Sequence, residues 1–283
     1  MILTSKNFNL ERTLSCGQTF RWKQQPDGSW FGIVLDKPLI IKQTGNTLDL
    51  SASEEDKSFW YDYFALDRDY GEMEALLASD PQTAPAIECS SGIKILRQNP
   101  YETLISFVVS QNNNVKRISG IIEKLCTAYG EKGQHMGIDY YEFPKNETLA
   151  NATVHDLEIL GTGYRAPYII DCVQKIRNGF DLSALRSLSF EQAKKELMRL
   201  KGVGPKVAEC IMLFSLGFDT AFPVDVWVKR ISAWLYPGEK GYVAAKAAAE
   251  RFGCWAGAAQ QYLFHYARTV GLKPIKVKED VKA

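Results

Sequence analysis

Residues 196–230 read ELMRLKGVGPKVAECIMLFSLGFDTAFPVDVWVKR. The stretch holds a tight-turn signal, Gly202-Val203-Gly204, because glycine adopts the backbone angles of such turns at little cost. Residues 189–200 open with the capping-box pattern SFEQ, which predicts a helix before the turn. Pro205 suits the first position of a second helix, which we expect to run to about Ser215. The sequence therefore predicts two helices joined by a short hairpin.

Two side chains in this stretch can act together chemically. Lys206 directly follows the hairpin, and Asp225 lies 19 residues later, at the end of PVD. The free amides of the turn and of the second helix form an anion site that suits a DNA phosphate. For a lone glycine turn, the alternative is a surface lysine and a helix-capping aspartate beside an ordinary interhelical connection. A lysine directly after the hairpin, with PVD at this distance, favours the chemical interpretation.

The stretch LKGVGPKVAEC followed by PVD resembles the helix-hairpin-helix DNA glycosylases. Four further stretches are similar to the 8-oxoguanine DNA glycosylase/AP lyase family and occur in that family's order from residue 14 to residue 264. They are Leu14–Trp22, Ser110–Asn114, Leu160–Ala166 and Ala256–Phe264. The resemblance covers nearly the whole chain, and together these stretches are far more specific than the hairpin alone.

The resemblance implies an antiparallel β-rich N-terminal domain and two helical domains that flank an active-site cleft. The residues agree independently, because short β-branched or aromatic runs with turns fill residues 1–50 and helical periodicity dominates from about residue 94. We therefore expect an α+β fold. An N-terminal antiparallel β-sheet domain with flanking helices (1–93) precedes mostly α-helical domains (94–283), with the hairpin near 201–205.

Individual elements follow from the same patterns. An aromatic run at 59–64 is expected to pack in the core, and the tail 273–283 to fray. Strands are expected near 19–22, 30–34 and 39–41. Helices are expected at 99–110, 115–129, 153–160, 167–178, 224–234, 242–252 and 255–268.

The resemblance identifies Lys206 as the catalytic amine and Asp225 as its carboxylate partner. A neutral lysine amine can attack C1′ of the sugar and form a Schiff base, which makes strand cleavage by β-elimination easy. Lysine suits this task, since burial or nearby cations readily cause lysines to lose their proton. Asp225 would stabilise positive charge on the sugar and assist proton transfers. It can also cap the helix that begins at Val226, and both roles can coexist.

Recognition of a damaged base requires that it leave the DNA stack and enter a pocket. The resemblance assigns to Gly17 a carbonyl that accepts from N7–H, a proton that 8-oxoguanine has and guanine lacks. Cys210, on the Lys206 face of its helix, would pair with Phe264 to sandwich the base. Gln260 would read the Watson–Crick edge. Taken singly, these residues are as well explained as a turn glycine, two core residues and a solvated glutamine.

The orphaned cytosine would be held by Asn112, Arg117 and Arg165, with Tyr164 wedged into the gap left by the flipped base. Arginine offers paired donors, which match the acceptors O2 and N3 of cytosine. A helix-capping asparagine and two surface arginines are the alternative interpretation of these residues taken alone.

The chain departs from the family at Trp227, where the better-known eukaryotic members have a histidine that contacts a phosphate. We expect Trp227 to pack beside the DNA backbone instead. The resemblance also implies that carbonyls of Met198, Leu200 and Val203 can hold a structural cation. No other cofactor is expected.

The composition argues against several other classes of protein. The six cysteines are scattered with no CxxC pair, which excludes a zinc ribbon and the four-cysteine iron–sulfur loop of related glycosylases. The net charge is +1, so contact with DNA must be local. No apolar stretch approaches the roughly 18 residues of a membrane span, and no signal-peptide pattern is visible. We expect a monomer in the cytoplasm, associated with the nucleoid if the source is bacterial.

The sequence thus predicts a bifunctional enzyme that excises 8-oxoguanine opposite cytosine in duplex DNA and then nicks the abasic site. Two alternatives differ from it. A helix-hairpin-helix glycosylase for another lesion is disfavoured by the base-pocket residues above. A non-catalytic DNA-binding module would need the hairpin but neither Lys206 nor Asp225, and covalent trapping separates it from both enzymes.

Overall fold

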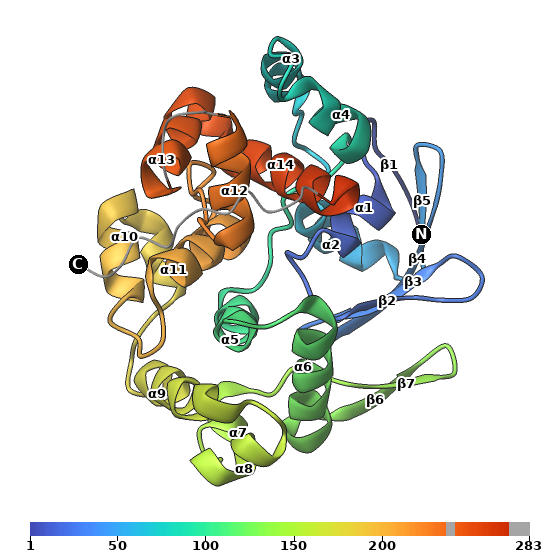
Figure 1. The fold of residues 1–283 in the computed structure, drawn as a ribbon. Coiled ribbons are helices and arrows are strands. Elements are labelled where there is room, and N and C mark those ends of the chain that lie inside the picture. Colours follow the sequence, from blue (N-terminus) through green and yellow to red (C-terminus); the bar gives the residue numbers. More distant parts are fainter. Residues whose placement is uncertain (236–240, 272–283) are drawn as a thin grey trace.

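The structure is a computed structural model that describes residues 1–235 and 241–271. A five-stranded antiparallel sheet lies on one side of the molecule, and most of the rest is helical (Figure 1). Its strands follow the order β1-β5-β4-β3-β2, which confirms the expected N-terminal antiparallel sheet and the α+β class. They are β1 (Ile2–Thr4), β2 (Trp22–Gln24), β3 (Trp30–Val34), β4 (Lys37–Thr44) and β5 (Thr47–Leu50).

The first predicted strand begins later than expected. β2 starts at Trp22, so most of residues 19–22 lies outside the sheet. The cause is Gln18, whose buried side chain donates to the Lys94 carbonyl at 2.8 Å and accepts from the Leu96 amide at 2.9 Å. A buried amide needs such partners, and these bonds hold the segment against residues 94–96 instead of the sheet ladder.

The aromatic run at 59–64 packs in the core, as predicted. Trp60, Tyr63 and Phe64 are buried in one hydrophobic cluster with residues of the sheet. The first hundred residues also form several helical elements. They are α1 (Leu10–Ser15), the short 3₁₀ turn η1 (Glu54–Asp56), α2 (Lys57–Tyr63), α3 (Gly71–Ala78) and α4 (Ala84–Ser90).

The predicted helices beyond residue 94 are all present, and most of their ends differ from the expected ones by at most two residues, but the helix expected over 189–200 ends three residues early, at Leu197. The longer ones are α5 (Pro100–Ser110), α6 (Val115–Tyr129), α9 (Ala166–Arg177), α12 (Val226–Leu235), α13 (Gly241–Phe252) and α14 (Ala256–Val270). The shorter ones are α7 (Asn146–Leu149), α8 (Val154–Ile159), α10 (Phe190–Leu197), α11 (Pro205–Ile211), η2 (Gly163–Arg165), η3 (Ser183–Ser187) and η5 (Gly253–Trp255). A π-helical turn, η4 (Met212–Leu216), extends α11 close to its expected end.

A second, two-stranded sheet interrupts the helical part and was not predicted. β6 (Lys132–His135) pairs with β7 (Ile138–Tyr141) in an antiparallel hairpin. Met136 and Gly137 connect the strands with φ angles of +48° and +82°. β6 reads KGQH and holds no apolar residue, so it lacks the alternation of apolar and polar residues that reveals a half-buried strand.

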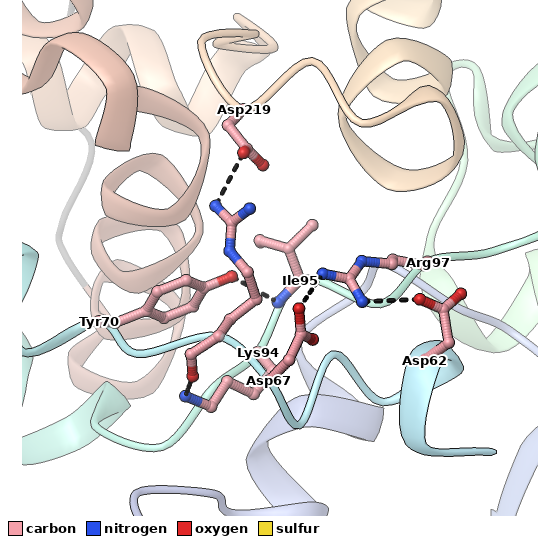
Figure 2. Close-up of polar contacts among 8 residues, drawn as sticks. Asp62, Asp67, Tyr70, Lys94, Ile95, Arg97 and Asp219 are labelled. Atoms are coloured by element: carbon pink, nitrogen blue, oxygen red, sulfur yellow. Dashed lines mark hydrogen bonds and ion pairs between the residues drawn. The ribbon is translucent and has the colours of Figure 1, made fainter. Parts of the chain in front are cut away.

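Ion pairs connect the N-terminal part to the helical part (Figure 2). Arg68 Nη2 lies 2.7 Å from Oδ2 of Asp219, a residue that precedes α12. Arg97 lies 2.7 Å from Asp62 and 2.8 Å from Asp67. The Arg68–Asp219 pair thus joins the N-terminal part to the helical part, and the two Arg97 pairs hold the segment that leads into α5 against the N-terminal part.

A larger hydrophobic cluster joins the helices and includes Cys16 and Phe20 from the N-terminal segment. The segment that carries Gly17 is therefore part of the helical core and not of the sheet. Within the described residues, no helix is long and apolar enough to cross a membrane. The tail 273–283, expected to fray, lies outside the described residues.

Candidate active site

The hairpin forms between α10 and α11, as predicted. Ser189 and Gln192 make a complete capping box at the start of α10. Gly202 has φ +81°, and a Cβ there would lie 2.4 Å from the ring of Tyr168, so glycine is required on both counts. Gly204 is extended, with φ −88° and ψ −179°, and is the residue before α11. The left-handed conformation is therefore needed at one of the two hairpin glycines.

Lys206 and Asp225 line the same cavity, whose volume is about 530 Å³. Asp225 Oδ1 accepts from the Val228 amide at 2.8 Å, so the carboxylate also caps α12. Asp225 is therefore both a helix cap and part of the cavity wall. The remaining wall comes from Ser110–Asn113, Gly204, Pro205, Val207, Val224, Val226, Trp227 and Lys229.

The amine of Lys206 lies near the ring of Phe107 and the thiol of Cys210. Its Nζ lies 5.3 Å from the ring centroid of Phe107 on α5. Burial raises the pKa of the Cys210 thiol to about 11, while the Lys206 amine, hydrogen-bonded to it, acts in the opposite direction. Lys206, Cys210 and Asp225 are thus close enough to interact electrostatically.

The structure brings Gly17 and Phe264 together, although they are far apart in the sequence. A Cβ on Gly17, which has φ +89°, would lie 3.7 Å from the Phe264 ring. Gln261 Nε2 donates to the Cys16 carbonyl at 2.8 Å and fixes this segment on α14. Gln260 is only 5% exposed, and its Oε1 has no hydrogen-bond partner among the described residues. A buried acceptor without a partner is costly, and a ligand can supply the missing donor.

The residues proposed for the orphaned cytosine gather around the α5–α6 connection. Asn112 is exposed and has φ +46°, a strained angle for a residue other than glycine. Arg117 is exposed, and Tyr164 is 52% exposed, although its hydroxyl donates to the Gln111 carbonyl at 3.4 Å. Arg165 differs, because it is 2% exposed and its guanidinium donates to the carbonyls of Gln111, Asn112 and Thr162.

Trp227 lies on the cavity wall, and the Arg230 guanidinium sits 5.2 Å from its ring centroid. The carbonyls expected to hold a cation lie at the hairpin. That of Leu200 accepts from the Val203 amide at 3.1 Å and keeps a second lone pair. No group of three or more His, Cys, Asp or Glu side chains suited to a metal occurs within residues 1–235 and 241–271.

Three residues of this region escaped the sequence analysis. Tyr168 supports both Gly202 and the ring of Tyr164, which it meets edge-on at 6.1 Å. Arg268 places its guanidinium 5.5 Å from the Phe264 ring centroid, next to Gly17. Tyr168 and Arg268 each lie four residues after a predicted site residue, and this helical spacing could have revealed both of them. Gln261, the third, offers no such signal.

Comparison with known families divides the chain into two parts. Residues 1–104 match the family described as "8-oxoguanine DNA glycosylase, N-terminal domain". Residues 105–253 match the "HhH-GPD superfamily base excision DNA repair protein" family, which covers more than half of the chain.

Individual relatives agree with these families. The N-glycosylase/DNA lyase of Saccharomyces cerevisiae is 34% identical over 251 residues, which are 79% of this chain and 67% of the yeast protein. The structure of MBOgg1 with a low-affinity DNA ligand superposes with a TM-score of 0.92, at 41% identity, over 95% of this chain and 96% of that one. The structure of the Clostridium acetobutylicum 8-oxoguanine glycosylase/lyase with double-stranded DNA that contains cytosine opposite 8-oxoguanine superposes with a TM-score of 0.90, at 38% identity. The match covers 96% of this chain and 99% of that one.

Proposed function

This chain belongs to the 8-oxoguanine DNA glycosylase family of the HhH-GPD superfamily, and from that premise we propose that it excises 8-oxoguanine opposite cytosine and then nicks the abasic site. The observation that carries the proposal is the shared cavity of Lys206 and Asp225 beside the hairpin. A purely DNA-binding hairpin has no use for an amine and a carboxylate in one cavity.

Binding would begin at the hairpin. The amides of Gly202, Gly204 and the start of α11 would donate to a backbone phosphate, with the dipole of α11 adding to the attraction, whereas the Val203 amide already donates to the Leu200 carbonyl. Tyr164, half exposed at the turn before α9, would enter the gap that the flipped base leaves. Tyr168 supports both features, so the phosphate contact and the wedge would move as one unit.

The flipped base would enter between Cys210 and Phe264. Gly17 would accept a hydrogen bond from N7–H, which guanine lacks, and so distinguish the oxidised base from the normal one. Gln260 supports this assignment, because its buried Oε1 is unpaired and a guanine Watson–Crick edge offers the donors N1–H and N2–H. Discrimination would thus come from one backbone carbonyl and recognition of guanine from one amide.

Catalysis would then proceed at C1′. The Lys206 amine attacks that carbon as the bond to the base breaks, and the departing base carries away the electron pair and gains a proton. Asp225 stabilises the positive charge on the sugar and stays aimed at it because it is held as a helix cap. The bound nitrogen then loses a proton, and the C1′–O4′ bond breaks to open the sugar ring and leave a Schiff base at C1′. A proton leaves C2′, the C3′–O3′ bond breaks, and the 3′ phosphate is eliminated.

The opposing cytosine would be read by Asn112, Arg117 and Arg165, the last after its guanidinium leaves the carbonyls that it now binds. A cation at the carbonyls of Met198, Leu200 and Val203 would make the hairpin amides a better phosphate site. We also propose that the enzyme is a monomer and that it acts in the cytoplasm, associated with the nucleoid if the source is bacterial.

Borohydride trapping on duplexes that carry several lesions, each opposite each normal base, tests the proposal. We expect a covalent adduct with 8-oxoguanine opposite cytosine in preference to the other duplexes. An adduct confined to another lesion would establish the alternative glycosylase. Binding without any adduct, even at a preformed abasic site, and without release of any base would establish a non-catalytic module.

A further inference from the structure

We propose that Arg268 is a recognition residue for the lesion, which donates a hydrogen bond to O8, the oxygen that oxidation adds to guanine. The inference rests on the proposed function, in which Gly17, Gln260 and Phe264 hold the flipped base. None of those assignments supplies a donor for O8. Arg268 has no other role in the reaction, and its position beside two of these residues is the evidence for this one.

The guanidinium of Arg268 lies where Gly17 and Phe264 meet. Its Nη1 would be 3.3 Å from a Cβ on Gly17, and its central carbon lies 5.5 Å from the ring centroid of Phe264. The carbonyl carbon of Gly17 is bonded to the same Cα as that Cβ, so a guanidinium beside one is close to the other. Gln260, Phe264 and Arg268 follow one another at four-residue spacing on α14 and therefore share one face of the helix.

The donors of Arg268 are available to a ligand. Its side chain is exposed, and among the described residues it makes no hydrogen bond and no ion pair. Its contact with Phe264 is a cation–π contact, which places the guanidinium beside the ring and leaves its N–H groups unpaired. A base stacked on the same ring would therefore meet these donors.

The hydrogen-bonding groups of the base decide which atom Arg268 contacts. In 8-oxoguanine the N7–H donor lies between two acceptors, O6 and O8. Gln260 would read the Watson–Crick edge, where its amide can accept from N1–H and donate to O6. With N7–H on the Gly17 carbonyl, O8 is left as an acceptor without a donor, which is costly once the base is enclosed. Arg268, beside that carbonyl, supplies the donor.

The experiment compares two single-turnover rates, excision of 8-oxoguanine opposite cytosine and nicking at a preformed abasic site opposite cytosine. Arg268→Gln should slow excision about tenfold to a hundredfold, the loss expected for a hydrogen bond from a charged donor. Nicking at the abasic site should keep the wild-type rate, because no base is present to contact. An equal loss in both rates would assign Arg268 to general DNA binding and overturn the proposal.

Arg12→Gln is the matched control for charge. Burial lowers the pKa of His265, and the charges of Arg12 and Arg268 lower it further, so each substitution removes one positive charge near the same histidine. Arg12 instead donates its Nη1 to the Ser91 carbonyl at 2.9 Å. Loss of that bond would affect both rates together, so the ratio of excision to nicking should stay at the wild-type value. A fall in this ratio equal to that of Arg268→Gln would contradict a specific contact.

A duplex with 8-thioguanine tests the contacted atom, because sulfur is a weak acceptor in the place of O8. The penalty of Arg268→Gln should shrink to less than threefold on this lesion, whereas the larger size of sulfur affects both proteins and cancels in the comparison. An undiminished penalty would exclude O8 as the partner. A wild-type enzyme that never excises 8-oxoguanine would instead contradict the proposed function, so the two failures are distinguishable.

Discussion

Gln261 donates to the carbonyl of Cys16 at 2.8 Å, and the two residues are 245 positions apart in the chain. The bond attaches α14 to the segment that carries Gly17. Both partners are buried, so water cannot replace either of them. The adjacent Gln260 differs, because its buried Oε1 acceptor has no hydrogen-bond partner among the described residues. The two glutamines therefore form a matched pair for separating stability from recognition.

Gln261→Met should lower the free energy of unfolding by about 1–3 kcal/mol, because the Cys16 carbonyl loses its buried donor. Gln260→Met removes an unpaired acceptor and should leave the free energy of unfolding unchanged or slightly higher. Its excision of 8-oxoguanine should nevertheless fall by about tenfold or more. Urea denaturation and single-turnover excision measure the two effects, and an equal loss of stability in both variants would contradict the assignment.

Lys206→Gln should abolish both borohydride trapping and strand nicking, because an amide cannot form a Schiff base. Binding to a lesion duplex should survive, since the hairpin amides of Gly202–Gly204 are unchanged. Lys229→Gln, which removes another lysine from the same cavity wall, is the control and should still trap. A Lys206→Gln protein that traps would identify another amine as the nucleophile.

Asp225→Asn separates the two roles of this residue. Asparagine caps helices as well as aspartate does, so the bond to the Val228 amide and the start of α12 should persist. The lost negative charge should slow base excision by about a hundredfold or more. Single-turnover excision with parallel thermal denaturation provides the measurement. A rate close to that of the wild type would leave Asp225 as a cap alone.

Much of this arrangement was predictable from local patterns. The capping box at Ser189 predicts the start of α10 to within one residue, and the helix expected over 115–129 coincides with α6. Such signals depend on neighbours in the chain, which the sequence displays directly. The β6–β7 hairpin was missed because it buries little apolar surface and therefore leaves no periodicity.

Side-chain partners across the fold were beyond the sequence. Gln18 looks like a polar residue at the start of a strand, yet it is buried and holds its segment against residues 94–96. Arg165 looks like a free pair of donors, yet its guanidinium is occupied by backbone carbonyls. Where a long polar side chain finds its partner depends on the packing of distant elements, which no local pattern encodes.

Thiol reactivity should separate the cysteines by burial. Burial raises the pKa of Cys16 and Cys210 to about 11 and that of Cys126 and Cys172 to about 12, whereas Cys254 is exposed. Only the thiolate is alkylated, so a raised pKa leaves the buried thiols protonated and slow at pH 8. Iodoacetamide followed by peptide mass spectrometry should find Cys254 labelled first, and Cys254→Ser should remove this fast phase. Equally fast labelling at Cys210 would contradict the buried site.

The two arginines proposed for the opposing base differ in the structure. The side chain of Arg117 is exposed at the first turn of α6, whereas Arg165 binds the carbonyls of Gln111 and Asn112 and so shapes the loop that carries Asn112. Removal of Arg165 should therefore damage the loop itself. Removal of Arg117 should leave the loop intact and affect only the reading of the opposing base.

Arg117→Ala should relax the preference for cytosine more than it slows excision opposite cytosine. Cytosine presents two adjacent acceptors, whereas adenine places its amino donor next to N1, facing a side chain that can only donate. An unpaired donor in a closed interface costs about 1–3 kcal/mol, or roughly tenfold to a hundredfold in selectivity. Arg165→Ala should instead slow excision opposite all four bases and lower the melting temperature. Single-turnover excision opposite each base decides between them, since full selectivity in Arg117→Ala would exclude this residue from reading the opposing base.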